Sequence, residues 1–266
     1  MPPSTTFDAT APQPAAARAT APSARNRRVV DAPVRLFHAL FALCFIGAYL
    51  TAESEHWRAL HVTLGYTFAA MLVLRVVYGL AGPRHAGIGS LWRKLGGAPA
   101  WLRAAGGAFR ERRIAAVPWR QGQNLAMAAA VLALITLALP LALSGIAGHN
   151  EWGGAWLADA LEEVHEFFGE VMLAVVLAHV GLVVALSLAR RRNIATPMLT
   201  GRVEGAGPDL VTKNRAGLAA AVLAAVVAFW AWQWHSAPEG LFPMDAVSGA
   251  MAALNGARDD GDDDDD

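Results

Sequence analysis

The stretch EEVHEFFGEVMLAVVLAHV, residues 162–180, decides the fold of this chain. It belongs to an apolar run long enough to cross the ~30 Å hydrocarbon core of a bilayer as a helix, which takes ~20 residues. The stretch also carries His165 and His179, which lie 14 residues apart. At ~100° per residue, this spacing puts both imidazoles on nearly one helix face and separates them by roughly 21 Å along the axis. One helix can therefore serve two sites stacked across a membrane.

Composition places the whole chain in the membrane class. Its 266 residues are 55% hydrophobic, and the mean hydropathy is +0.34. Several apolar runs reach spanning length and together predict an all-α integral membrane protein. We expect transmembrane helices at residues 34–52, 59–81, 125–147, 163–189 and 216–234. The first four form one bundle, and the fifth, near the C-terminus, reads as an addition to it.

Lysine and arginine residues predict the orientation, because short loops rich in them stay in the cytoplasm. The residues just before the first span, the loop at 82–124 and the start of the segment after the fourth span are basic. The loops after the first and third spans are predominantly acidic. We therefore expect a multi-pass protein of the bacterial inner (cytoplasmic) membrane, with a cytoplasmic N-terminus and a periplasmic C-terminus.

Both ends of the chain lie outside the expected bundle. Residues 1–33 are rich in Ala, Pro, Ser and Thr and predict a disordered cytoplasmic tail. Residues 235–266 end in a run of aspartates and predict an acidic extracytoplasmic tail. Between them we expect a four-helix domain at 34–202, followed at 203–234 by a linker and the fifth helix.

Two further histidines, His38 and His61, lie in the first two apolar runs. A histidine in the bilayer core is costly and is by default a functional candidate that faces the bundle interior with a partner. The predicted orientation places His61 and His165 near the outer surface, and His38 and His179 nearer the inner one. Two neutral imidazoles at matched depth supply the two axial ligands of a six-coordinate haem iron. The sequence therefore predicts an outer pair, His61/His165, and an inner pair, His38/His179, in a transmembrane haem-binding bundle.

The expected cofactors are two haem b groups. The chain has one cysteine, Cys44, and lacks the C-x-x-C-H signature of covalent haem attachment, so any haem must be held by side-chain ligands alone. A single membrane histidine often only hydrogen-bonds to a neighbouring helix. The prediction therefore depends on the matched set of four, and two such haems would form an electron path across the membrane.

Arg75 and four glycines in the spans each allow two interpretations of their role. Arg75 lies 14 residues after His61 and could pair with a propionate of the inner haem, or its side chain could extend to the nearby membrane interface. The small residues in the spans could let a flat macrocycle approach, or could serve close helix packing. These small residues are Gly47, Gly65, Gly169 and Gly181.

Four segments taken in order resemble a known family. They are DAPVRLFHAL at 31–40, WRALHVTLGYTFAAMLVLRVVYGLAGPRHA at 57–86, the stretch at 162–180 quoted above, and RRNIATPMLTGR at 191–202. Together they are similar to the prokaryotic cytochrome b561 group, which includes the di-haem cytochrome b subunits of nickel-iron hydrogenases. The resemblance covers about residues 29–202. It departs at residues 122–125, where this chain reads GQNL and relatives often read Gly-His-Asn-Pro.

The resemblance implies a four-helix bundle that moves electrons between membrane quinone and a redox partner at one surface. It carries the haem ligands of the family onto His38, His61, His165 and His179. We therefore expect an electron-transfer subunit embedded in membrane lipid, with quinone as substrate and an extracytoplasmic cytochrome c, hydrogenase or other dehydrogenase as partner. Whether the chain is itself a quinone oxidoreductase stays open. No nucleic-acid partner is expected.

Two other classes of function remain as alternatives. A transporter or channel could use the histidines as a proton relay, and it would call for further acidic residues within the spans. A structural anchor could hold a peripheral enzyme at the membrane, and it would tolerate the loss of all four histidines. The haem hypothesis instead predicts that the histidines act in pairs.

Overall fold

A computed structural model of the chain describes residues 26–83, 87–205 and 207–236. Within these residues, five helices are long and apolar enough to cross a membrane. They are α1 (Ala32–Leu50), α2 (Arg58–Ala81), α5 (Trp119–His149), α6 (Ala155–Ala189) and α8 (Ala216–Ser236). The prediction of an all-α membrane protein with a fifth C-terminal span is therefore confirmed.

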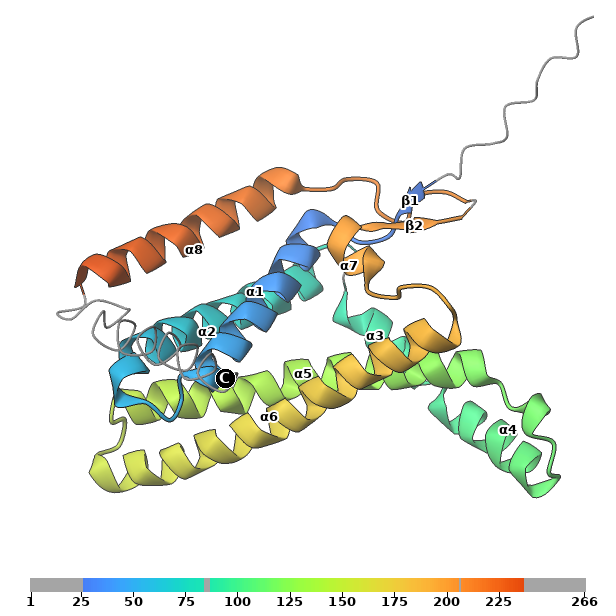
Figure 1. The fold of residues 1–266 in the computed structure, drawn as a ribbon, viewed down its shortest axis with the longest axis horizontal. Helices are drawn as coiled ribbons and strands as arrows, with labels where there is room; N and C mark the ends of the chain where they lie inside the picture. The colour runs from blue at the N-terminus through green and yellow to red at the C-terminus, as the bar shows by residue number, and fades with distance from the viewer. Residues whose placement is uncertain (1–25, 84–86, 206, 237–266) are drawn as a thin grey trace, which may run out of the picture.

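Shorter elements join the long helices. They are η1 (Glu55–Trp57), α3 (Ile88–Leu95), α4 (Ala98–Arg110), η3 (Ile114–Ala116), α7 (Thr196–Thr200), and the strands β1 (Asn26–Arg28) and β2 (Arg202–Glu204). We call the end of the bundle at which α1 begins the inner end, and the opposite end the outer end. The segment with α3 and α4 connects α2 to α5 at the inner end, and Figure 1 shows α4 projecting away from the start of α5.

The inner end is tied together by a two-stranded sheet. β1 and β2 pair antiparallel, with Arg27 opposite Val203. Gly201 ends α7 in the left-handed conformation (φ +76°), and a Cβ there would meet the Val30 carbonyl at 2.7 Å, so only glycine suits the turn. Residues 26–33, expected within a disordered tail, thus form β1 and the start of α1, whereas residues 1–25 and the aspartate run lie outside the described residues.

The long helices form three layers (Figure 1). α5 and α6 run side by side, α2 packs against both α1 and α5, and α8 packs against α1 and α2. Figure 1 shows α8 on the side of the α1–α2 pair that faces away from α5 and α6. The predicted histidines project from three of these helices, His38 from α1, His61 from α2, and His165 and His179 from α6.

Two contacts between α5 and α6 bound a length of helix that is close to the thickness of a bilayer core. At the inner end, Arg190 Nε donates to the Gln123 side-chain oxygen over 3.2 Å. At the outer end, Gly145 lies against the ring of His165. Gln123 and Gly145 are 22 residues apart, which is roughly 33 Å of helix and close to the ~30 Å hydrocarbon thickness. His165 is therefore near the outer boundary, and the first turns of α6 extend beyond it.

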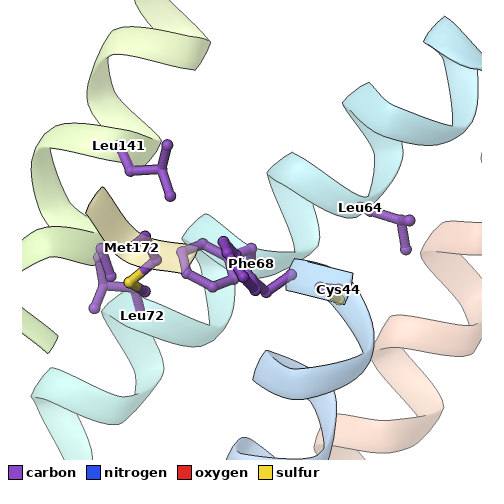
Figure 2. Packing of buried hydrophobic residues seen from close by; sticks show 8 residues of the cluster. Cys44, Leu64, Phe68, Leu72, Leu141 and Met172 are labelled. Atoms are coloured by element: carbon purple, nitrogen blue, oxygen red, sulfur yellow. The ribbon is translucent and has the colours of Figure 1, made fainter. Parts of the chain in front are cut away.

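The apolar core lies midway between the histidine levels. Its buried members come from α1, α2, α5 and α6 and include Cys44, Phe68, Leu72, Leu141 and Met172 (Figure 2). Met172 is 7 residues from His165 and 7 from His179, so it sits roughly 10 Å from each along the axis. An apolar layer therefore separates an outer from an inner level of the bundle.

The fifth helix is fixed to the bundle by hydrogen bonds within the membrane. Trp230 Nε1 donates to Thr67 Oγ1 over 2.8 Å, and Gln233 Nε2 donates to Thr63 Oγ1 over 3.4 Å. Both threonine side chains are buried and lie one turn apart on the α8-facing side of α2. α8 is thus a packed part of the structure and does more than lengthen the chain.

Candidate functional site

The imidazoles of His61 and His165 face each other across the outer part of the bundle. His61 projects from α2 and His165 from α6, and their ring centroids are 6.1 Å apart with the planes at 81°. Imidazole nitrogens bind metal ions at roughly 2 Å, so two rings on opposite sides of one ion have centres about 6 Å apart. The separation of the rings suits a single metal ion between them.

Each ring is oriented by a backbone carbonyl. His61 Nδ1 lies 2.8 Å from the Ala48 carbonyl of α1, and His165 Nδ1 lies 2.9 Å from the Leu141 carbonyl of α5. A carbonyl only accepts, so each Nδ1 must carry the proton, and in the neutral ring Nε2 keeps its lone pair. Metal-binding histidines generally donate their second ring N–H in this way, which fixes ring orientation and raises ligand basicity.

The carbonyl partners follow from local helix structure. Ala48 lies in the last turn of α1, where its carbonyl accepts only the longer bonds from the Thr51 amide (3.3 Å) and the Thr51 hydroxyl (3.2 Å) at the helix end, and it can accept from a side chain as well. The Leu141 carbonyl lies in the middle of α5, and it also accepts from Ser144 Oγ over 3.2 Å. A carbonyl has two lone pairs and can accept two hydrogen bonds. Both partners are backbone atoms, so the side chains of the sequence give no signal for them.

Gly145 lets the His165 ring lie directly against α5. A Cβ at this position would come within 2.6 Å of His165 Cε1 and 2.7 Å of its Nδ1, closer than non-bonded atoms can approach. Any side chain there would displace the ring and lengthen its bond to the Leu141 carbonyl. The sequence analysis did not single out Gly145, because a glycine within an Ala-rich and Leu-rich helix has no distinctive pattern.

The second pair of histidines lies at the inner level. His38, on α1, is exposed at the protein surface, and His179, on α6, is half-buried. The two side chains are close enough for their charges to interact. Among the described residues, the buried Nδ1 of His179 has no hydrogen-bond partner. A buried nitrogen without a partner is costly unless a group from outside the chain satisfies it.

Arg75 provides a second buried nitrogen at the inner level that has no hydrogen-bond partner among the described residues. Its side chain is half-buried on α2, and its Nη1 is buried without a hydrogen-bond partner in the described part of the chain. Arg75 interacts electrostatically with Asp31 and Tyr78, so it lies at the inner end of the bundle. Its buried Nη1 can donate to an anionic group such as a carboxylate.

Among the glycines in the spans, one serves close helix packing and two others leave space beside the histidine rings. A Cβ at Gly47 would meet Leu64 Cδ1 at 2.6 Å, so this glycine serves the close packing of α1 on α2. A Cβ at Gly65 would meet open space, and one at Gly169 would come no nearer than 4.0 Å to another atom. These two lie one turn from His61 and His165, on the same helix faces as the rings. Open space beside both rings fits a flat macrocycle.

A polar network at the inner end was not predicted from sequence. Tyr78 donates to Asp31 Oδ2 over 2.5 Å, and Arg215 Nη1 donates to the Tyr78 hydroxyl over 3.1 Å. Asp31 is fully buried and caps α1 by accepting from the Val34 amide over 3.3 Å. The three side chains come from distant parts of the chain, so no local pattern connects them.

The other histidines that the structure describes lie away from both pairs. His149 is exposed at the end of α5, with its ring 6.3 Å from that of Tyr66, and His56 is exposed in η1. His235 is exposed in the last turn of α8. His85 lies outside the described residues. The bundle thus brings together the four histidines of the membrane spans and leaves the other described ones at its ends.

A helical membrane bundle with facing histidines inside it defines the class of membrane cytochromes. A family model described as prokaryotic cytochrome b561 matches residues 29–201 of this chain. The chain belongs to the prokaryotic cytochrome b561 family and is accordingly a membrane electron-transfer protein that binds haem b. A search of curated proteins and a search of solved structures each found no significant match.

Proposed function

We propose that this chain holds two haem b groups, one between His61 and His165 and one between His38 and His179. The observation that carries the proposal is the outer pair: two rings 6.1 Å apart, each with Nδ1 bonded to a backbone carbonyl. The inner pair is supported by the depth match along α1 and α6 and by the electrostatic interaction between His38 and His179, which requires the two side chains to lie near each other. The four-helix domain at 34–202 would hold both haems.

The residues of the site bind and orient the cofactors. His61 and His165 would hold the outer haem through Nε2, and their bonds to the Ala48 and Leu141 carbonyls hold the rings in place. Arg75 would pair with a propionate of the inner haem through its buried Nη1. When bound, a haem supplies a centre that accepts and gives one electron at a time.

The two levels would form one electron path through the membrane. The ligand pairs are roughly 21 Å apart along α6, and the apolar cluster around Met172 fills the space between them. This cluster excludes water from the path and keeps the dielectric low around both sites. Each level would then lie near one face of the bilayer, where it could exchange electrons with a different partner.

The outer level would serve an extracytoplasmic partner. His165 lies near the outer end of the apolar part of α5 and α6, and Asp159, Glu162 and Glu163 are exposed on α6 just beyond it. Acidic side chains around an electron exit favour a partner with a basic docking face. We propose a cytochrome c, a hydrogenase or another dehydrogenase as this partner, and membrane quinone as the reactant at the other end of the path.

The proposed orientation is that of the sequence analysis: bacterial inner membrane, inner end and N-terminus in the cytoplasm, C-terminus in the periplasm. The basic residues of the inner end support it, because α3 and α4 carry Arg93, Lys94 and Arg110 near their ends. A proton-relay function is less well supported. His61 and His165 each use Nδ1 to donate to a backbone carbonyl, and a carbonyl cannot pass a proton onward.

The test is a haem count on the purified full-length chain. A reduced-minus-oxidised spectrum identifies the haem type, and a pyridine haemochrome assay against protein concentration gives the number per chain. We expect b-type spectra and two haems per chain. One haem per chain would contradict the di-haem proposal, and a folded chain without haem would contradict the proposed ligand sets.

A further inference from the structure

The connection between α2 and α5 presents a row of exposed apolar side chains at the inner end. On α4, Leu102 and Phe109 are 61% and 53% exposed. They lie seven residues apart, which places them on one face of the helix. Gly106 lies between them on the same face, where a Cβ would meet open space. Large apolar residues exposed along one helix face indicate a surface that contacts a partner or a lipid bilayer.

Trp119 extends this row to the start of α5. Its ring lies edge-on against that of Phe109, with the ring centroids 6.3 Å apart, and it is 49% exposed. We call Leu102, Phe109 and Trp119 the α4 patch. Trp119 is one helical turn before Gln123, which lies near the inner boundary of the hydrocarbon core. The α4 patch therefore lies close to the depth of the lipid head groups, where tryptophan is enriched.

The buried face of α4 fixes this helix on α5. Trp101 Nε1 donates to the Pro118 carbonyl over 3.1 Å. The Trp101 ring lies against Gly122 of α5, where a Cβ would come within 2.6 Å of it. Ala105 and Ala108 are buried in the small apolar cluster against which Trp101 packs. The α4 patch is thus presented by a fixed helix, which Figure 1 shows projecting away from the start of α5.

Basic side chains flank the α4 patch. Arg103 and Arg110 each follow a patch residue by one position and are exposed, so they form a second row beside the patch. Five further basic residues are exposed between α3 and the start of α5: Arg93, Lys94, Arg112, Arg113 and Arg120. Glu111 is the one acid in residues 87–124. This charge complements the phosphates of anionic lipids, which attract basic segments beside a membrane span.

We propose that α4 lies on the bilayer leaflet at the inner end and binds the phosphate groups of anionic phospholipids. The α4 patch would enter the boundary between head groups and acyl chains, and Arg103 and Arg110 would reach the phosphates beside it. The bilayer is the occupant because the patch continues into α5 at Trp119, just before α5 enters the hydrocarbon core. The proposal needs only a bundle that crosses the membrane, so it does not depend on the haem sites.

A spin label at position 106 tests the proposal. A side chain at Gly106 meets open space, so the label leaves the α4 patch intact. Gly106→Cys is made in a Cys44→Ala background, since Cys44 is the only cysteine. The full-length protein is placed in vesicles of phosphatidylcholine with or without phosphatidylglycerol. Ala104→Cys is the matched control, because Ala104 is exposed on the opposite side of α4.

Power-saturation electron paramagnetic resonance compares the collisions of each label with oxygen, which concentrates in lipid, and with a nickel chelate, which stays in water. With phosphatidylglycerol present, the oxygen-to-nickel collision ratio should be about threefold or more higher for Gly106→Cys than for Ala104→Cys, because only the first label faces the bilayer. In phosphatidylcholine alone, the two ratios should approach each other. Circular dichroism checks that each variant is folded.

The double variant Arg103→Gln, Arg110→Gln tests the part played by charge. With the Gly106→Cys label and phosphatidylglycerol, its collision ratio should fall to the value found in phosphatidylcholine. Arg58→Gln, Arg202→Gln is the control, since it removes two exposed charges away from α4 and should leave the ratio unchanged.

A Gly106→Cys label that stays in water with phosphatidylglycerol present would overturn the proposal. So would equal immersion of this label in the two kinds of vesicle, or in the double variant and its parent. Dipolar broadening between labels on two copies of the chain would assign the α4 patch to self-association, which also overturns the proposal.

Discussion

The imidazoles of His61 and His165 lie 6.1 Å apart with their planes nearly perpendicular, and each is tied to the backbone of a different neighbouring helix. His61 depends on α1 through Ala48, and His165 depends on α5 through Leu141. All four helices of the bundle therefore contribute to the geometry of one histidine pair. A change that shifts either supporting helix is expected to alter the outer site before it alters the inner one.

Gly145→Ala tests this dependence. The added methyl would come within 2.6 Å of the His165 ring and push it out of position, so His165 would hold the proposed outer haem less well. We expect half of the low-spin haem signal in the electron paramagnetic resonance spectrum to disappear. Gly148→Ala is the matched control, since a Cβ there meets its nearest neighbour at an ordinary 3.6 Å. Equal spectra for the two variants would show that Gly145 does not position His165.

Arg75→Gln tests the proposed partner of the inner propionate. Removing a positive charge beside a haem disfavours the reduced form, which carries one more negative charge, so the midpoint potential should fall. We expect a drop on the order of 60 mV, which is a tenfold change in the one-electron equilibrium. Redox titration followed by visible spectroscopy measures it, with Arg103→Gln in exposed α4 as control. A shift confined to the outer haem would contradict the placement of Arg75.

The double variant Asp159→Lys, Glu163→Lys tests electrostatic docking at the outer end. Both side chains are exposed on α6 beyond His165, so reversing their charge should slow the encounter with a basic partner. Stopped-flow mixing with a basic c-type cytochrome should give a several-fold lower second-order rate at low salt and little difference at high salt. Glu204→Lys, at the inner end, is the control. A rate that is insensitive both to the substitutions and to salt would argue against docking here.

Trp230→Phe tests whether the fifth helix is an integral part of the bundle. The change removes the 2.8 Å hydrogen bond to Thr67, and such bonds within membranes contribute about 0.6 kcal/mol on average. We expect the full-length chain to unfold at a slightly lower concentration of a denaturing detergent, with its haem content unchanged. Trp232→Phe is the control, because Trp232 is 61% exposed toward lipid. Identical unfolding curves would mean that this bond does not hold α8.

Hydropathy predicted the spans well because the apolar runs are long and end in polar loops. It placed the third span at 125–147 and the fourth at 163–189, whereas α5 is Trp119–His149 and α6 is Ala155–Ala189. The added turns contain polar and charged residues, such as Gln123 and Glu162. These residues lower the hydropathy of a window but do not stop a helix, since Gln and Glu are good helix formers. Helix length outside the membrane is therefore invisible to hydropathy.

The facing histidines could be predicted for a related reason. Depth follows from position within a span, and helical periodicity then fixes the face, so four residues of one type suffice to propose pairs. The parts that the sequence did not predict arise from tertiary contacts. The Ala48 and Leu141 carbonyls belong to the backbone, and Asp31, Tyr78 and Arg215 meet only because α1, α2 and the start of α8 converge. Periodicity within one helix carries no information about contacts between residues of different helices.

The most direct test of the account is a redox titration of four single variants: His38→Ala, His61→Ala, His165→Ala and His179→Ala. Each is purified, checked for folding by circular dichroism, and titrated with the haem count measured in parallel. The account predicts that His61→Ala and His165→Ala lose the same redox component, whereas His38→Ala and His179→Ala lose the other. His56→Ala, at an exposed position in η1, should keep both. Folded variants that each lost both components equally would contradict the pairing.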